Sequence, residues 1–229
     1  MSKHRILVIA LLSFLSFFKN IQAQDWPNLA KYQEANQKLL SAPIDENRVV
    51  FMGNSITEGW SSGLPSFFEN PSYVNRGISG QTTPQMLLRF RQDVIDLKPK
   101  AVLILAGTND IAGNTGPMSL EQIRDNIQSM VELAQANNIN PIICSVLPAS
   151  DYPWKPGMEP HIKIPQLNQL LQQLAREKNV LYLDYFAAMA NTRNGLPKEL
   201  AEDGVHPTKA GYEIMSKIAH KIIPMALKN

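Results

Sequence analysis

Cysteine is nearly absent from this sequence of 229 residues, since Cys144 is the only one. A single cysteine excludes an internal disulfide and a cysteine-rich metal site. Cys144 stands within the apolar run from Pro141 to Val146, where we expect it to be a small buried side chain. No chemistry is therefore assigned to its thiol.

A strong charge of either sign is also absent. The chain has 22 basic and 20 acidic residues, a formal net charge of +2. Three of the basic residues, Lys3, Arg5 and Lys19, fall in the first 23 residues, which contain no acidic residue, so 19 basic and 20 acidic residues remain beyond them. This balance gives no electrostatic reason to expect nucleic acid or an anionic membrane as a partner.

The apolar run near the start of the chain is too short for a membrane span. It extends from Ile6 to Phe18, whereas a spanning helix requires roughly 20 apolar residues. Basic residues precede the run, and the small residue Ala23 follows it. This pattern predicts a secretory signal over residues 1–23 and an exported protein with no stable membrane insertion after cleavage. Residues 24–229 are expected to form a single domain.

Neither glycine turn in the first third of the chain has a nucleotide-binding motif. The turn from Gly53 to Gly59 follows an apolar run, as a P-loop does, but Glu58 precedes its second glycine and no lysine follows. The turn Gly77-Ile78-Ser79-Gly80 lacks the glycine spacing of a dinucleotide site. Both phosphate-binding interpretations are therefore rejected.

What the sequence does contain is a regular alternation of short apolar runs and amphipathic segments. The apolar runs predict strands at residues 48–52, 72–75, 101–106, 141–146 and 180–183. Amphipathic spacing predicts helices at residues 25–40, 83–97, 119–134, 167–174 and 208–222, with Ser119 and Gln122 as a capping box. Such alternation predicts an α/β fold with a central parallel sheet of about five strands and helices on both faces.

Ser55, in the turn after the first expected strand, could be a nucleophile if the chain supplied a base. A serine hydroxyl is unreactive near neutral pH without a base, a group that orients the base and donors for the oxyanion. Beyond residue 23 the chain has only three histidines, His161, His206 and His220. His206 follows Asp203 by three residues, so that Asp203 can accept from one ring nitrogen while the other faces Ser55. On its own, this loop is better explained as a solvated turn before a helix.

Four segments taken together resemble the sequence blocks of the SGNH (GDSL-type) hydrolase superfamily. In chain order they are Gly53-Asn54-Ser55, Gly77 to Thr83, Gly107-Thr108-Asn109-Asp110 and Asp203-Gly204-Val205-His206-Pro207. The resemblance implies a flavodoxin-like, three-layer α/β/α sandwich that transfers acyl groups to water through an acyl-serine, with no metal or other cofactor. A non-catalytic binding module with the same fold is the alternative class, because fold alone does not establish function.

The resemblance also assigns roles to individual residues. Ser55 becomes the nucleophile, His206 the general base and later the general acid, and Asp203 the group that orients the imidazole. The backbone N–H groups of Ser55 and Gly80 and the side-chain amide of Asn109 become the oxyanion hole. The first block departs from the usual Gly-Asp-Ser-Leu at Asn54 and Ile56. We expect the mechanism to survive this departure, because the usual aspartate is not a triad member.

The substrate is less well defined than the reaction. No long apolar insertion suggests a lipase lid, which favours short acyl esters, and acetyl esters of carbohydrate first. Lysophospholipids, thioesters and acetyl esters like platelet-activating factor remain alternatives. Trp60, Tyr152 and Trp154 could present flat faces to a sugar ring, although core packing or loop anchoring explains them equally well. We take Asn54, Trp60 and Trp154 as candidate substrate contacts.

Overall fold

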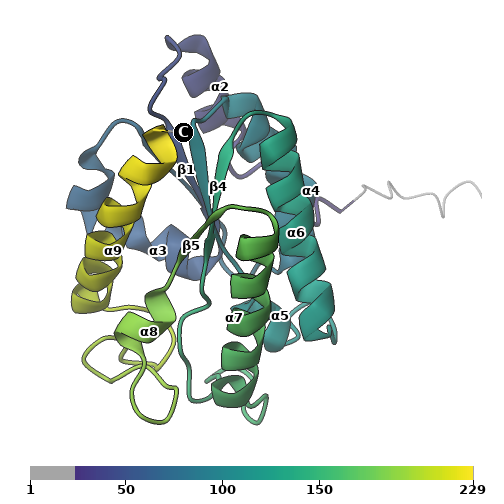
Figure 1. Cartoon of the computed structure of the whole chain (residues 1–229), viewed down its shortest axis with the longest axis vertical. Coiled ribbons are helices and arrows are strands. Elements are labelled where there is room, and N and C mark those ends of the chain that lie inside the picture. The colour runs from purple at the N-terminus through teal and green to yellow at the C-terminus, as the bar shows by residue number, and fades with distance from the viewer. Residues whose placement is uncertain (1–23, 229) are drawn as a thin grey trace, which may run out of the picture.

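Five parallel strands lie at the centre of the computed structural model, which describes residues 24–228 (Figure 1). Their spatial order is β2-β1-β3-β4-β5. Their bounds are Val49–Gly53 (β1), Tyr73–Gly77 (β2), Ala101–Leu105 (β3), Asn140–Cys144 (β4) and Leu181–Leu183 (β5). All five expected strands are confirmed, with ends displaced by at most two residues. The secretory signal expected at residues 1–23 lies outside the described residues.

The carboxyl ends of the three strands β2, β1 and β3 lie at the same level of the sheet. Gly53, the last residue of β1, pairs with Gly77 of β2 and with Leu105 of β3. Parallel strands require crossover connections, so each of these strands is followed by a segment that leaves the same edge of the sheet. The side chains just after β1, β2 and β3 are therefore placed near one another.

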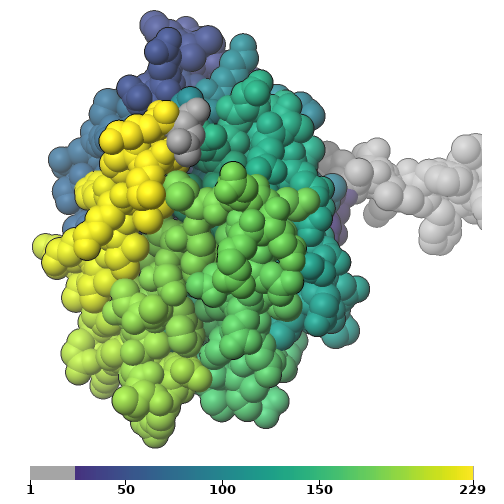
Figure 2. All heavy atoms as spheres, in the orientation of Figure 1, coloured from purple at the N-terminus to yellow at the C-terminus, as the bar shows by residue number. Residues whose placement is uncertain are grey.

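Helices cover both faces of the sheet, and the expected α/β/α sandwich is confirmed (Figure 1). One face carries α3 (Ser55–Gly63), α8 (Tyr185–Met189) and α9 (Lys209–Lys228), and the other carries α4 (Thr83–Asp93), α6 (Leu120–Ala136) and α7 (Pro160–Glu177). Successive residues of a strand point to opposite faces of the sheet, so each strand contributes to a hydrophobic core on both faces. Val50 and Met52 pack toward α4, α6 and α7, whereas Phe51 packs toward α3 and α9. In the space-filling view, α9 in yellow lies against the light green segment that includes α8 (Figure 2).

The expected helix at residues 25–40 is wrong in its first half. Residues 25–32 form turns, and α2 spans only Gln33–Ser41. Asn28 has a φ of 56°, which a right-handed helix does not allow, and the Asp25 carboxylate accepts hydrogen bonds from the N–H groups of Leu29 and Ala30. The composition of residues 25–32 is thus typical of a helix, but two of their backbone N–H groups bind the Asp25 carboxylate instead of helix carbonyls.

The other expected helices are present, but several of their ends were wrong. The helix expected at residues 167–174 is α7, Pro160–Glu177, and the one expected at residues 208–222 extends as α9 to Lys228. The helix expected at residues 83–97 ends as α4 at Asp93. The capping box is confirmed, since the Ser119 hydroxyl accepts from the Gln122 N–H at 3.2 Å and the Gln122 side chain accepts from the Ser119 N–H at 2.9 Å. The short helix α5 (Thr108–Ile111) and the 3-10 turns Pro65–Glu69 and Ile95–Leu97 complete the described elements. Across residues 24–228, no helix combines the length and apolar character needed to cross a membrane.

Candidate active site

The turn after β1 places Ser55 at the first position of α3. Asn54 is the N-cap of this helix, and its side-chain oxygen accepts from the Ile56 N–H at 3.0 Å. The first N–H groups of a helix have no partner within the helix. The Ser55 N–H has no acceptor among residues 24–228, so it can serve as a donor. The start of α3 packs so closely on β2 that a Cβ at Gly77 would lie 2.1 Å from the Glu58 nitrogen.

Ser55, His206 and Asp203 form a continuous series of hydrogen bonds. The Ser55 Oγ lies 2.9 Å from His206 Nε2, and His206 Nδ1 lies 2.6 Å from Asp203 Oδ2. The other carboxylate oxygen of Asp203 accepts from the backbone N–H groups of Val205 and His206, at 2.9 and 2.8 Å. The carboxylate is thus fixed by its own loop, and a proton on Nδ1 leaves Nε2 able to accept the serine proton.

The ionisation of Asp203 suits its contact with the imidazole. Partial burial alone would raise the pKa of this carboxyl. Hydrogen bonds from the His206 ring and from the backbone N–H groups of His206 and Val205 outweigh burial, and the pKa of Asp203 is lowered. Asp203 is therefore a carboxylate near neutral pH, able to accept from the ring.

The two other expected oxyanion donors follow β2 and β3. Gly80 has a φ of +77°, which favours glycine, and a Cβ at this position would meet no atom within 4 Å. Its loop thus borders open space where a substrate could lie. Asn109 is buried on α5, and one hydrogen of its amide goes to the Gln81 carbonyl at 2.9 Å. A side-chain amide has two N–H donors, so the second remains for an oxyanion.

Trp154 lies beside His206. Its ring centroid is 6.1 Å from that of His206, and 43% of its surface is exposed. Below it, the fully buried Tyr152 stacks on Trp154 at 5.0 Å and its hydroxyl lies 2.9 Å from the Thr108 hydroxyl. The indole N–H donates to Asn114 Oδ1 at 3.2 Å. Trp154 is thus an exposed, supported aromatic face at the site, whereas Tyr152 serves as its support.

The structure corrects two of the candidate substrate contacts. Trp60 is only 1% exposed and stacks between Phe67 and Tyr212, at centroid distances of 4.6 and 5.8 Å. Asn54 is equally buried, and its side chain caps α3. Because neither side chain presents a surface to solvent, neither remains a candidate for substrate contact.

The remaining histidines lie apart from Ser55. His161, on α7, has its Nδ1 at 3.1 Å from the Ser150 carbonyl oxygen. His220, on α9, packs against the Phe67 ring at 5.0 Å. Of the three histidines beyond residue 23, His206 is the one whose ring contacts the Ser55 hydroxyl.

Asn114 is a site residue that sequence reasoning missed. Its side chain accepts from Trp154 and donates to the Gly80 carbonyl at 3.1 Å, so it joins the aromatic face to the loop of the expected oxyanion hole. A lone asparagine between two glycines has no distinguishing pattern in the sequence. Among the described residues 24–228, no three His, Cys, Asp or Glu side chains are grouped as a metal site requires.

Asp110, next to Asn109, is a buried carboxyl with incomplete hydrogen bonding. Its Oδ1 accepts from the Thr83 N–H at 2.8 Å and from the Thr83 hydroxyl at 2.6 Å. Its Oδ2 is buried and has no hydrogen-bond partner within the part of the chain that the structure describes. Burial outweighs the hydrogen bonds from Thr83 and raises the pKa of Asp110 to about 6.

Asp110 is expected to make the protein less stable as the pH rises through 6. The pKa of the folded state, about 6, lies above the ordinary value of 3.8, so the folded protein binds more protons between these values and loses stability as pH increases. The full effect is about 3 kcal/mol. Asp110→Asn removes this titration, so its melting temperature relative to wild type should be higher at pH 7.5 than at pH 4. Parallel curves of melting temperature against pH for the two proteins would contradict this prediction.

Ser55, His206 and Asp203, joined by hydrogen bonds at the carboxyl edge of a parallel sheet, have the arrangement of a serine hydrolase. A family model for the GDSL-like Lipase/Acylhydrolase family matches residues 51–214, and the chain belongs to this family. The predicted SGNH hydrolase resemblance is thereby confirmed, and the protein is an esterase.

Individual relatives agree with this membership. The crystal structure of a GDSL-like lipase from Bacteroides thetaiotaomicron VPI-5482 superposes with a TM-score of 0.83 at 44% identity, covering 87% of this chain and 98% of that one. An acetylxylan esterase from Geobacillus stearothermophilus is 27% identical over 154 residues, 63% of this chain and 68% of the relative. An uncharacterized lipoprotein of Bacillus subtilis is 39% identical over 82 residues, about a third of each chain (34%).

Proposed function

We propose that this esterase is exported and hydrolyses short acyl esters, acetyl esters of carbohydrate first, through an acyl-serine intermediate. The observation that carries the proposal is the exposed face of Trp154 beside His206. A general acid at His206 would protonate the departing alcohol, so the aromatic face borders the space into which the alcohol part of the ester leaves. A flat aromatic surface suits a sugar ring, which offers it an apolar face.

In the proposed reaction, His206 Nε2 takes the proton of the Ser55 hydroxyl as the oxygen attacks the ester carbonyl. The oxyanion that forms accepts hydrogen bonds from the N–H groups of Ser55 and Gly80 and from the Asn109 amide. The carbonyl re-forms as the C–O bond to the alcohol breaks, and His206 gives its proton to the leaving oxygen. A water molecule, deprotonated by His206, then attacks the acyl carbon. The bond from this carbon to Ser55 Oγ breaks, His206 returns the proton to Oγ, and the acid is released. Asp203 orients the ring and stabilises its charged form throughout.

Two relatives support the substrate class and the location. The acetylxylan esterase is named for an acetylated polysaccharide, which agrees with an aromatic face for a sugar. The likeness to a lipoprotein, together with the signal expected at residues 1–23, supports a periplasmic or secreted protein.

A substrate panel tests the proposal. The purified protein is assayed on acetylated xylan, on acetylated sialic acid and on p-nitrophenyl esters from acetate to octanoate. We expect acetyl release from a carbohydrate and the highest kcat/KM among the p-nitrophenyl esters for acetate. Replacing Trp154 by alanine should raise KM for the sugar ester by roughly 3- to 10-fold, as the loss of about 1 kcal/mol of aromatic contact predicts. The p-nitrophenyl acetate rate should fall less.

Trp154→Phe is the matched control for the aromatic face. Phenylalanine keeps a flat ring but lacks the indole N–H that donates to Asn114, so it separates stacking from that hydrogen bond. We expect the phenylalanine variant to retain most of the affinity for the sugar ester. A preference for p-nitrophenyl octanoate over acetate would overturn the assignment to short acyl groups and favour a lipid or thioester substrate. Equal losses on sugar and p-nitrophenyl esters would overturn the role of Trp154.

A further inference from the structure

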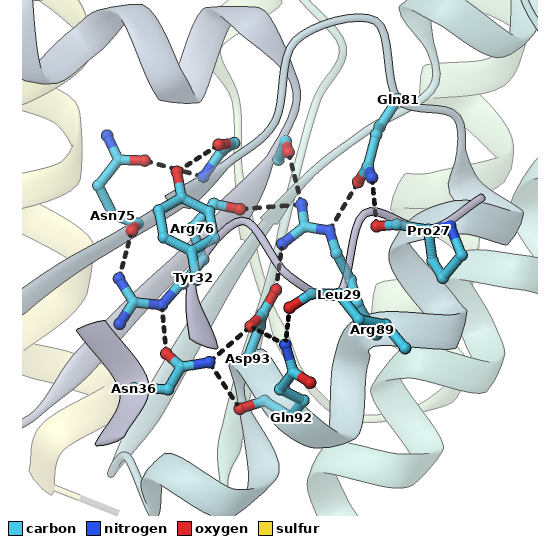
Figure 3. Close-up of polar contacts among 12 residues, drawn as sticks. Pro27, Leu29, Tyr32, Asn36, Asn75, Arg76, Gln81, Arg89, Gln92 and Asp93 are labelled. Atoms are coloured by element: carbon cyan, nitrogen blue, oxygen red, sulfur yellow. Dashed lines mark hydrogen bonds and ion pairs between the residues drawn. The ribbon is translucent and has the colours of Figure 1, made fainter. Parts of the chain in front are cut away.

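Arg89 is a fully buried cation at the back of the candidate active site. It extends from α4, is 0% exposed, and pairs with Asp93 one turn away at 2.9 Å (Figure 3). Taking both charges out of water is costly, and apolar side chains often stabilise a core equally well. Desolvation lowers the pKa of Arg89, and Asp93 opposes that shift. A contribution to stability alone therefore does not account for an arginine at this position.

The other acceptors of Arg89 lie next to the segments that hold Ser55 and Gly80. One amino group of the guanidinium, Nη2, donates to the carbonyls of Gly53 at 3.0 Å and Arg76 at 2.9 Å, the ends of β1 and β2. The Nε group donates to the Gln81 side chain at 2.6 Å. The planar guanidinium has fixed donor directions, so one side chain sets the spacing between the nucleophile turn and the Gly80 loop.

Gln81 extends this contact to the third expected oxyanion donor. Its backbone carbonyl accepts from the Asn109 amide at 2.9 Å, and its side chain accepts from Arg89. The Gln81 amide also donates to the Pro27 carbonyl at 2.7 Å (Figure 3). A displacement of Gln81 would therefore move Gly80, its neighbour in the chain, and turn the amide of Asn109.

The turns at residues 25–32 contact both α4 and the start of the Gly80 loop. Gln85 and Gln92, both on α4, donate to the carbonyls of Trp26 at 2.8 Å and Leu29 at 2.5 Å. The Tyr32 hydroxyl donates to the Gly77 carbonyl at 2.5 Å, at the start of the Gly80 loop. These contacts explain why the segment is not helical, since its carbonyls accept from side chains of α4 and its neighbours.

We infer that Arg89 and Gln81 are positioning residues that align the Gly80 N–H and the Asn109 amide with Ser55. The inference rests on the proposed roles of these three residues as oxyanion donors and nucleophile. Both side chains are buried, so neither is placed to touch a substrate. A misplacement of about 1 Å can cost roughly 100-fold in rate, so loss of this alignment lowers kcat more than it raises KM.

Arg89→Met tests the inference, with Arg48→Met as the matched control. Arg48 is also buried, but its side chain donates to the Leu97 carbonyl. It precedes Val49, the first residue of β1, at the end of the strand opposite Gly53. Both variants leave buried hydrogen-bond acceptors without their donor, so both should melt at lower temperature than wild type. With p-nitrophenyl acetate below the melting transition, we expect Arg89→Met to lower kcat by roughly 10- to 100-fold with KM within about threefold. The kcat of Arg48→Met should stay within about threefold of wild type.

Inhibition by phenylboronic acid provides a readout that stability alone does not affect. Boron forms a tetrahedral adduct with a reactive serine, and one oxygen of the adduct resembles the oxyanion. The inhibition constant of Arg89→Met should rise in parallel with the loss in kcat, while that of Arg48→Met should match wild type. Gln81→Met, which keeps the backbone carbonyl but loses both side-chain contacts, should act in the same direction and decides the question if Arg89→Met does not fold.

Wild-type values of kcat and of the boronate inhibition constant in Arg89→Met and Gln81→Met would overturn the inference. So would an equal loss of kcat in Arg48→Met, because the effect would then follow from any buried arginine. Failure of the proposed site gives a different result: a Ser55→Ala protein that still hydrolyses p-nitrophenyl acetate or binds the boronate at wild-type levels would remove the basis of both proposals.

Discussion

Replacing Ser55 by alanine is expected to lower kcat for p-nitrophenyl acetate by roughly 10⁴-fold or more. The substitution removes the hydroxyl that lies 2.9 Å from His206 Nε2, and with it the acyl-serine intermediate. The backbone N–H of residue 55 stays in place, so residual hydrolysis through the other groups of the site is expected. Initial rates over a range of substrate concentrations measure the loss, and a melting curve shows whether the fold is retained.

Ser62→Ala is the matched control for this experiment. Ser62 lies on the same helix, α3, and its hydroxyl donates to the Gly59 carbonyl at 3.0 Å, so the same atoms are removed without loss of a contact to His206. We expect its kcat to stay within about twofold of wild type, as for an ordinary surface substitution. Hydrolysis by Ser55→Ala at the rate of the wild-type protein would overturn the proposed acyl-serine mechanism.

The sheet was predictable because its strands are short apolar runs buried on both faces. Residues 101–106, for example, form a short apolar run, the pattern typical of a strand buried on both faces, and the structure confirms β3 at Ala101–Leu105. The helix α3 was not predictable in the same way. Its sequence contains Gly59 and Gly63, which are poor helix formers. Tyr212 packs against both, and a Cβ at either position would lie 2.9 Å or less from its ring or hydroxyl.

The tryptophans show where sequence reasoning about the site ends. Trp60 and Trp154 were equal candidates for substrate contact, and no local signal separates them. Trp60 is buried because Phe67 and Tyr212, which are distant from each other in sequence, stack on its two faces. The exposure of Trp154 likewise depends on Tyr152 filling the space beneath it. Burial is a property of the packed molecule, and only tertiary structure distinguishes the two rings.

The contacts of Arg89 are a second feature that the sequence does not reveal. An arginine and an aspartate four residues apart, as at Arg89 and Asp93, are usually a solvated pair on a helix surface. Here the pair is buried, and the Arg89 guanidinium also donates to the backbone carbonyls of Gly53 and Arg76. Backbone acceptors leave no side-chain pattern. The four sequence blocks therefore point to the expected catalytic groups, while the buried contacts of Arg89 behind them appear only in the structure.

Replacing His206 by alanine is expected to be about as harmful as replacing Ser55, because the members of a triad act as a unit. For the same reason the double variant Ser55→Ala, His206→Ala should be scarcely slower than either single variant. His161→Ala is the control: its ring contacts the Ser150 carbonyl at 3.1 Å rather than Ser55, so its kcat for p-nitrophenyl acetate should stay within about twofold of wild type. If His161→Ala were the damaging change and His206→Ala the mild one, the base would be His161. The 2.9 Å contact between His206 and Ser55 would then have no catalytic meaning.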